Sequence, residues 1–240
     1  MKMPFSINHY SNGPSRHALL YAKKLLAHAG GNIHTILDVG AGDGIVSSVI
    51  GDSTETIYRG VDVGAPIYAK TSHVVYLQEP SLVLDWLRQS ARGVGGDKSS
   101  DAVVCFDMLE HCDDMSAFAH CLFSMKSKYV MISLPNEMSI HNRVRFLLGK
   151  PIPCHGMRMA ESSEGHRHRW LIDYASAKLY FANLAESNEY LLAGEVFSTI
   201  LPRTRWKRLL IKPFLSVFPF SLRSHGFALL FERSDMSDLK

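Results

Sequence analysis

The chain has 240 residues, 46% of them hydrophobic and 20% charged, with a formal net charge of +3 at neutral pH. This composition is sufficient for one packed domain and excludes an intrinsically disordered chain. The sequence has no apolar run long enough to cross a membrane, no secretory leader and four cysteines, so we expect a cytoplasmic protein without a disulfide framework.

Helices and strands are predicted to alternate over the first half of the chain, beginning with a helix over residues 14–31. Short β-branched or apolar runs then predict five strands, over residues 34–40, 56–64, 72–78, 101–106 and 128–135. Further helices are predicted over residues 44–51, 81–93 and 113–126. The last of these has Asp113 or Asp114 near its N-cap. This alternation predicts a doubly wound, Rossmann-like α/β fold with a mostly parallel sheet and helices on both faces.

After residue 135 the alternation gives way to an insertion, with a short helix over 139–149 and a polar, His-rich loop to residue 170. A helix capped by Asp173 and two strands are then predicted, over residues 173–187, 189–199 and 225–234. We predict one domain over residues 1–240, with an N-terminal helical cap, a cofactor-binding core, a substrate lid after the fifth strand and a C-terminal part. These parts span residues 1–32, 33–136, 137–170 and 171–240.

The segment "LDVGAGDG", Leu37 to Gly44, runs from a predicted strand through a glycine loop into a helix. Glycines allow a tight turn and a close approach of the backbone to a ligand. The dinucleotide fingerprint needs a glycine where this chain has Ile45. An acid, Asp38, precedes the loop, where it would repel a pyrophosphate but attract the ammonium group of a methionine moiety. The loop therefore favours S-adenosylmethionine over NAD.

A second acid, Asp62, ends the next predicted strand, in "RGVDVG". A carboxylate at this position can accept hydrogen bonds from both ribose hydroxyls of a nucleotide cofactor. Either cofactor has such a ribose, so Asp62 alone does not separate them. The alternative is that Asp38 and Asp62 are ordinary turn and cap residues.

The segments "ILDVGAGDG", "GVDV", "DAVVCFDMLEHCDD" and "VMISLPN" together resemble the successive motifs of class I S-adenosylmethionine-dependent methyltransferases of the type 11 subgroup. The resemblance covers roughly residues 33–136 and implies a seven-stranded sheet. More weakly, "LPNEMSIHNRVRFLLGKPIP" and "GHRHRWLIDYASAKLYF" are similar to MetW-like proteins.

The family resemblance also implies which residues bind the cofactor. Those expected to line the methionine part are Asp38, Gly40, Ala41 and Gly42. Asp62 would bind the ribose, with Val63 against the adenine, and Phe106 and Asp107 would lie beside the cofactor. Many members hold the adenine amino group with an Asp after the third strand. This chain has "YLQEP" there, so Gln78 is the expected substitute, with Glu79 as the alternative.

The stretch "CFDMLEHCDDM", Cys105 to Met115, concentrates potential ligand and acid/base groups. We predict no metal site there, because Cys105 is expected to pack within the sheet layer and the adjacent His111 and Cys112 point apart. His111 is the candidate general base, since an imidazole titrates near neutral pH. The alternative is that His111 is a polar wall residue and Glu110 a brace for the next helix.

The loop from Cys154 to Trp170 is rich in histidine and arginine. As a substrate lid, it would bind an anionic group through His166 and His168, together with Arg143 from the preceding helix. A solvated loop is the main alternative. A zinc site with Cys154 is disfavoured because the spacing matches no standard site, so no metal is predicted.

The segment "RTRWKRLLIKPFLSVFPFSLR", residues 203–223, mixes basic and aromatic residues. We favour a helix packed on the sheet over peripheral contact with a membrane. No nucleic-acid-binding module is recognisable.

We therefore predict a methyltransferase that uses S-adenosylmethionine and acts on a small molecule. The acceptor classes that the sequence favours are anionic, lipid-linked or sugar-linked. The alternatives are a non-catalytic, S-adenosylmethionine-binding partner protein of the MetW-like kind and an NAD(P)-dependent oxidoreductase. The sequence leaves the acceptor atom and the oligomeric state open.

Overall fold

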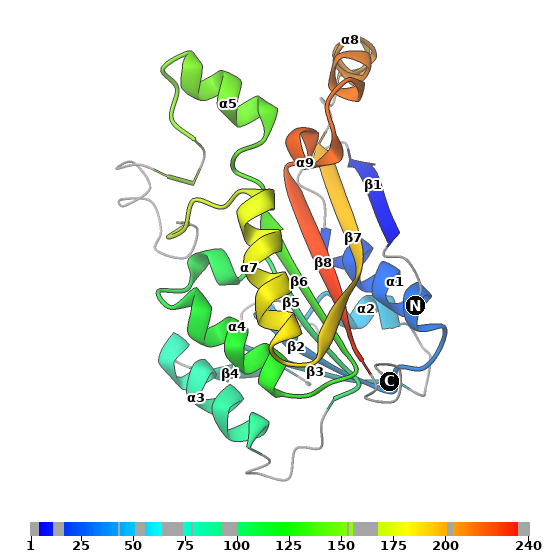
Figure 1. Cartoon of the computed structure of the whole chain (residues 1–240), viewed down its shortest axis with the longest axis vertical. Helices are drawn as coiled ribbons and strands as arrows, with labels where there is room; N and C mark the ends of the chain where they lie inside the picture. Colours follow the sequence, from blue (N-terminus) through cyan, green and yellow to red (C-terminus); the bar gives the residue numbers. More distant parts are fainter. Residues whose placement is uncertain are drawn as a thin grey trace.

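The computed structural model describes residues 5–11, 17–42, 44–50, 56–63, 74–77, 79–92, 100–152, 154–155, 168–200 and 204–234. Within these ranges one sheet of eight strands forms the centre of the molecule, in the order β1-β7-β8-β6-β5-β2-β3-β4 (Figure 1). The strands are β1 (Phe5–Ser11), β2 (Thr35–Val39), β3 (Ile57–Val63), β4 (Val74–Leu77), β5 (Ala102–Phe106), β6 (Tyr129–Pro135), β7 (Tyr190–Ile200) and β8 (Gly226–Arg233).

The sheet is mostly parallel, as the sequence predicted. Among the described strands β8 is the one that runs antiparallel to its neighbours, β6 and β7. The expected seven strands are β2 to β8, and each lies within two residues of its predicted bounds. The eighth strand, β1, pairs in parallel with β7 at the sheet edge. It lies in the part that we expected to be wholly helical, and an edge strand with one partner leaves little pattern in the sequence.

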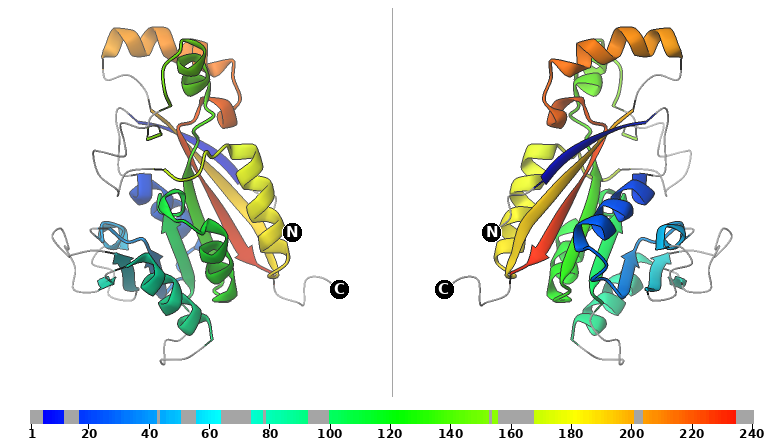
Figure 2. Two further views of the ribbon diagram at one scale, coloured as in Figure 1. Left: turned by 90° about the vertical axis from the view of Figure 1, so that its left-hand side faces the viewer. Right: turned by 90° about the vertical axis from the view of Figure 1, so that its right-hand side faces the viewer.

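Helices cover both faces of the sheet (Figure 2). They are α1 (His17–Ala29), α2 (Ser47–Ile50), α3 (Pro80–Ala91), α4 (Met115–Ser124), α5 (Ile140–Leu147), α7 (Tyr174–Glu186), α8 (Arg205–Ser216) and α9 (Phe220–Arg223), with a 3-10 turn, η1 (Leu109–His111). Helices α3, α4 and α7 pack on one face, and α1 packs on the other. The side chains of Asp114 and Asp173 accept hydrogen bonds at the starts of α4 and α7, which confirms both predicted caps.

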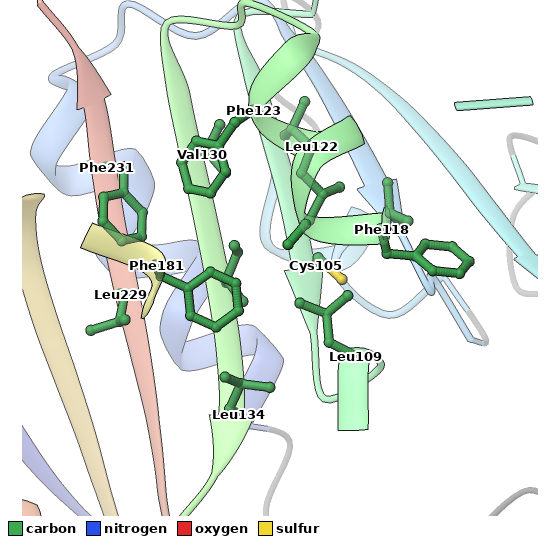
Figure 3. Packing of buried hydrophobic residues seen from close by; sticks show 14 of the residues in the cluster. Cys105, Leu109, Phe118, Leu122, Phe123, Val130, Leu134, Phe181, Leu229 and Phe231 are labelled. Atoms are coloured by element: carbon green, nitrogen blue, oxygen red, sulfur yellow. The ribbon is translucent and has the colours of Figure 1, made fainter. Parts of the chain in front are cut away.

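Alternate residues of each strand serve the two cores, because successive side chains of a strand point to opposite faces. On β5, Cys105 points toward α4 and α7, where it packs near Leu122 and Phe181 (Figure 3). Its neighbour Phe106 points to the α1 face. Cys105 is fully buried, so its predicted role in packing is confirmed.

Helix α8, within the basic segment, differs from the favoured prediction because it does not lie on a face of the sheet. It projects at the same end of the molecule as α5 (Figures 1 and 2). Trp206, Leu209 and Leu210 on α8 are 59%, 69% and 68% exposed. The segment forms a helix, as the favoured interpretation expected, but its mixture of basic and aromatic residues did not show whether the apolar side chains meet the sheet. In the described part of the chain, no helix is long and apolar enough to cross a membrane.

Candidate active site

The glycine loop leaves β2 in a conformation that depends on its glycines. Gly40 and Gly42 have φ angles of +79° and +55°, which residues other than glycine rarely adopt. The N–H groups of Gly40 and Ala41 donate to the carbonyl of Val61 at 2.8 and 3.2 Å, so β3 holds the turn. A Cβ atom on Gly40 would lie 2.5 Å from Cγ of Met108. The loop after β2 and the loop after β5 are therefore in direct contact.

Asp62 lies at the end of β3 and fastens the glycine loop. Its carboxylate accepts hydrogen bonds from the N–H of Gly42 and, at 2.5 Å, from the N–H of Val63. The hydroxyl of Tyr76 donates to the Gly42 carbonyl at 2.8 Å from β4. Burial raises the pKa of Asp62 above its usual range. The carboxylate lies beside the loop with Val63 exposed next to it, and the ribose and adenine contacts of the two residues stay predictions.

Asp38, the last residue but one of β2, is buried at 1% exposure. The hydroxyl of Tyr58 on β3 donates to its carboxylate at 2.8 Å. Burial raises the pKa of Asp38 to about 7, the Tyr58 hydrogen bond opposes this, and the charge of Asp62 adds to it. A cationic ammonium group would stabilise the ionised form of this carboxyl, and the contact of Asp38 with the methionine moiety stays a prediction.

Phe106 ends β5 and Asp107 follows it, and their side chains lie in different surroundings. The Phe106 ring is buried against Tyr21 of α1, with their centroids 5.7 Å apart. Asp107 is exposed at φ +50°, and its carboxylate accepts from the Ser133 hydroxyl at 2.7 Å. Of this pair, Asp107 presents its polar group to solvent at the strand end. Gln78, the expected adenine contact, lies outside the described residues.

His111 ends η1 and is half-buried. Its ring lies edge-on to that of His168, with their centroids 4.9 Å apart. Its Nε2 lies 3.9 Å from a carboxylate oxygen of Glu110, which is 2% exposed. Burial raises the pKa of Glu110 well above its usual range, and the charge of Asp107 adds to this effect. The side chains of Glu110 and His111 therefore lie close to each other, although the two residues are neighbours in the chain.

Glu137 was not among the residues predicted from the sequence, yet it connects two histidines of the insertion. One carboxylate oxygen, Oε1, accepts from Nε2 of His155 at 2.5 Å and from Nδ1 of His168 at 2.7 Å. The other oxygen accepts from the N–H of Ile172 at 2.8 Å. The sequence feature that could have indicated Glu137 is an acid directly after the Pro-Asn pair at the end of β6.

The descending arm of the lid insertion is fixed to the loop after β5. Arg169 donates from its N–H to the Glu110 carbonyl at 2.8 Å and from Nε to the His111 carbonyl at 3.1 Å. The indole of Trp170 donates to the Cys112 carbonyl at 2.7 Å. These bonds bring His168 to His111, a contact that the sequence could not show.

The other two predicted lid residues are not part of this contact. The Nε group of Arg143, on α5, donates to the Met138 carbonyl at 2.8 Å. His166 lies outside the described residues. The role of Arg143 and His166 in a substrate lid therefore stays a prediction.

A doubly wound sheet, a glycine loop after the first central strand and an acid at the end of the next define a nucleotide-cofactor protein of the Rossmann-like class. A family model described as a methyltransferase domain matches residues 14–209. The chain belongs to this family, and it is an S-adenosylmethionine-dependent methyltransferase. The residues that fit the cofactor are the glycine loop and Asp62, by the geometry described above. No curated protein sequence matches the chain significantly.

Solved structures share this fold at low sequence identity. A SAM-dependent methyltransferase from Archaeoglobus fulgidus has a TM-score of 0.56 and 14% identity, over 90% of this chain and 94% of its own. The plantazolicin methyltransferase BamL, solved with a triazolic desmethylPZN analog and S-adenosylhomocysteine, has a TM-score of 0.57 and 13% identity, over 91% of this chain and 85% of its own. A phosphoethanolamine N-methyltransferase from Haemonchus contortus has a TM-score of 0.51 and 14% identity, over 94% and 54%.

Proposed function

We propose that this methyltransferase acts on a small, anionic acceptor bound beyond the carboxyl ends of β5 and β6. The observation that carries the proposal is the contact between the two loops. Met108 touches the glycine loop at Gly40, and two residues later Glu110 and His111 begin the polar cluster with His168. In doubly wound sheets, ligands bind at this edge. An acceptor there would lie between the cofactor loop and groups able to move a proton.

His111 is the proposed general base. S-adenosylmethionine supplies an electrophilic methyl group, and alignment of the two reactants is the main task of the protein. An acceptor hydroxyl must also lose its proton as the new bond to carbon forms. The half-buried imidazole of His111 is suited to take that proton, and His168 packs against its ring. Arg143 and His168 are the proposed contacts for the negative charge of the acceptor.

The type 11 resemblance supports a small-molecule acceptor, and the histidine and arginine residues of the insertion support an anionic one. Turnover with a panel of acceptors tests the proposal. Calorimetry with S-adenosylmethionine should show binding, and formation of S-adenosylhomocysteine should then depend on one class of acceptor. The panel should contain carboxylates, phosphorylated amines, sugar phosphates and lipid-linked forms of each. Turnover on none of the anionic acceptors, or turnover on an uncharged acceptor alone, would overturn the proposed acceptor class.

A peripheral membrane contact through the basic segment is part of the proposal, because it would explain a lipid-linked acceptor. Helix α8 exposes Trp206, Leu209 and Leu210, and α5 exposes Phe146 and Leu147 at the same end of the molecule. Helix α5 begins five residues after β6 ends, so this end is also the carboxyl end of the parallel strands. Apolar side chains beside basic residues are typical of helices that lie in a membrane interface.

Co-sedimentation with vesicles tests the membrane contact. The protein should sediment with phosphatidylcholine vesicles that contain phosphatidylglycerol, and less with phosphatidylcholine alone. Replacing Leu209 and Leu210 together by glutamate should abolish sedimentation. Leu179→Glu is the matched control, because Leu179 is similarly exposed but lies on α7. Equal loss in the control, or no sedimentation of the unaltered protein, would contradict the contact.

A further inference from the structure

We propose that Glu137, His155 and His168 form a binding site for one divalent transition-metal cation. The three residues come from three places in the chain: the end of β6, the middle of the insertion and its descending arm. One ligand-type atom from each lies within 4.8 Å of the others. The inference goes beyond methyl transfer, since a cation could bind here whether or not an acceptor is methylated.

The distances suit a metal centre after a small expansion. Oε1 of Glu137 lies 2.5 Å from Nε2 of His155 and 2.7 Å from Nδ1 of His168. Ligands at about 2.0–2.2 Å from a zinc ion lie roughly 3 Å apart from one another. A cation would therefore replace the protons shared between Oε1 and the two rings, and the donor atoms would move apart by less than about 1 Å.

The ligand-bearing segments are held in place by bonds that a cation would not disturb. Glu137 is 4% exposed, and its second oxygen accepts from the Ile172 N–H at 2.8 Å. The N–H of His168 donates to the carbonyl of Cys154 at 3.2 Å, which fixes the arm that bears His168 beside the residue before His155. Outer bonds of this kind orient metal ligands and strengthen binding.

An independent observation comes from the neighbouring carboxylate of Glu110. This residue is 2% exposed, and its Oε2 atom has no hydrogen-bond partner among the described residues. Glu110, His111 and His168 form a second group of ligand-type atoms within 4.8 Å of one another. A buried carboxylate oxygen without a partner is costly. A cation held by His168 and Glu137 would place positive charge near this acid.

The donor set indicates the class of ion. Two imidazoles and one carboxylate suit Zn²⁺, Co²⁺, Ni²⁺ or Fe²⁺, whereas Mg²⁺ and Ca²⁺ prefer oxygen ligands alone. Three protein ligands leave at least one coordination position open. On the basis of the proposed function, that position would hold an anionic oxygen of the acceptor.

Metal titration of the full chain, after removal of bound ions with a chelator, tests the site. Zn²⁺ should bind in calorimetry at one equivalent, and Co²⁺ should give the visible absorption of a site with nitrogen ligands. His155→Ala and His168→Ala should each weaken binding by at least about tenfold. His120→Ala is the matched control, since His120 is exposed on α4, and it should bind as the unaltered protein does.

Two results would overturn the site: no binding of either ion, or equal binding by His155→Ala and His120→Ala. Circular dichroism and binding of S-adenosylmethionine by each variant separate loss of the ion from loss of the fold. A chain that binds the cofactor and methylates an acceptor but binds no metal would reject this inference alone. A chain that binds metal at His155 but not the cofactor would reject the proposed function alone.

Discussion

The side chain of Met108 occupies the space that a Cβ atom on Gly40 would need. The built Cβ position lies 2.5 Å from Cγ and 2.6 Å from Cβ of Met108. The sulfur of Met108 in turn lies 3.8 and 3.5 Å from those of Cys105 and Cys112. One residue thus connects the cofactor loop to the packed layer beneath the candidate active site.

Gly40→Ala should therefore destabilise the protein and weaken binding of S-adenosylmethionine. The new side chain would meet Met108 and would also have to adopt a φ of +79°. We expect a loss of about 3 kcal/mol in the free energy of unfolding. Denaturant unfolding and calorimetry would measure the two effects. Gly31→Ala separates the causes, because Gly31 has a φ of +86° and open space around it. Equal losses in both variants would rule out the Met108 contact as a cause.

Binding of S-adenosylmethionine should strengthen as pH rises toward neutrality. The pKa of Asp38 is raised to about 7, chiefly by burial, so the carboxyl becomes ionised only near that pH. The ionised form attracts an ammonium group. Calorimetry between about pH 5.5 and pH 7.5 should show the increase. Tyr58→Phe removes a hydrogen bond that lowers this pKa, so the increase should move to higher pH. An affinity without pH dependence would place Asp38 away from the ammonium.

The same carboxyl should make the cofactor-free protein less stable at higher pH. The folded pKa of Asp38 lies above the ordinary value of 3.8, so the native state holds the proton more tightly than the unfolded state. This contribution to stability is therefore present at low pH and is lost as pH rises to about 7, by a few kcal/mol at most. Urea unfolding of the protein and of Asp38→Asn should differ in their pH slopes over this window. Identical slopes would contradict the raised pKa.

Asp62→Ala should weaken cofactor binding by about tenfold or more, since hydrogen bonds to a charged group each contribute about 1.5–3 kcal/mol. The change also removes the acceptor of the Gly42 N–H, so the glycine loop loses one of its bonds to β3 and keeps those of Gly40 and Ala41. Calorimetry measures the affinity, and thermal unfolding shows that the chain still folds. Asp85→Ala, at an exposed ion pair with Arg88 on α3, is the control. Unchanged cofactor affinity in Asp62→Ala would refute the ribose assignment.

His111→Ala should reduce turnover by about a hundredfold, the scale of general-base catalysis, while the affinity for S-adenosylmethionine stays the same. The bound acceptor would keep its contacts, so KM should change less than kcat. His120→Ala should leave both parameters as they are, because His120 is exposed on α4. Normal turnover in His111→Ala would reject His111 as the general base and favour the alternative, in which it is a polar residue of the site wall.

Local patterns in the sequence were enough for most of the fold. Strands β2 to β8 are short apolar runs, and the caps Asp114 and Asp173 precede amphipathic helices, so neighbouring residues carry the information. Strand β1 was not predicted, because its partner β7 lies about 190 residues further along the chain. The position of α8 was not predicted, because the apolar residues of a helix do not show which surface packs against them.

The candidate site was predictable where its residues follow a strand end in a known motif. The glycine loop and Asp62 are of this kind. The cluster of Glu137, His155 and His168 was not predictable in this way. The two histidines follow Glu137 by 18 and 31 residues, and the three meet because the insertion folds back. A search for metal ligands within one stretch of sequence could not identify this cluster.

The insertion is closed at its base by a reciprocal pair of bonds. The Glu137 N–H donates to the Ile172 carbonyl at 3.0 Å, and the Glu137 carboxylate accepts from the Ile172 N–H. The chain between these residues can therefore vary in length at modest cost, because the entropy of closing a loop grows slowly with its length. Related chains could thus carry insertions of different length to recognise different acceptors, as long as His168, Arg169 and Trp170 still meet the loop after β5.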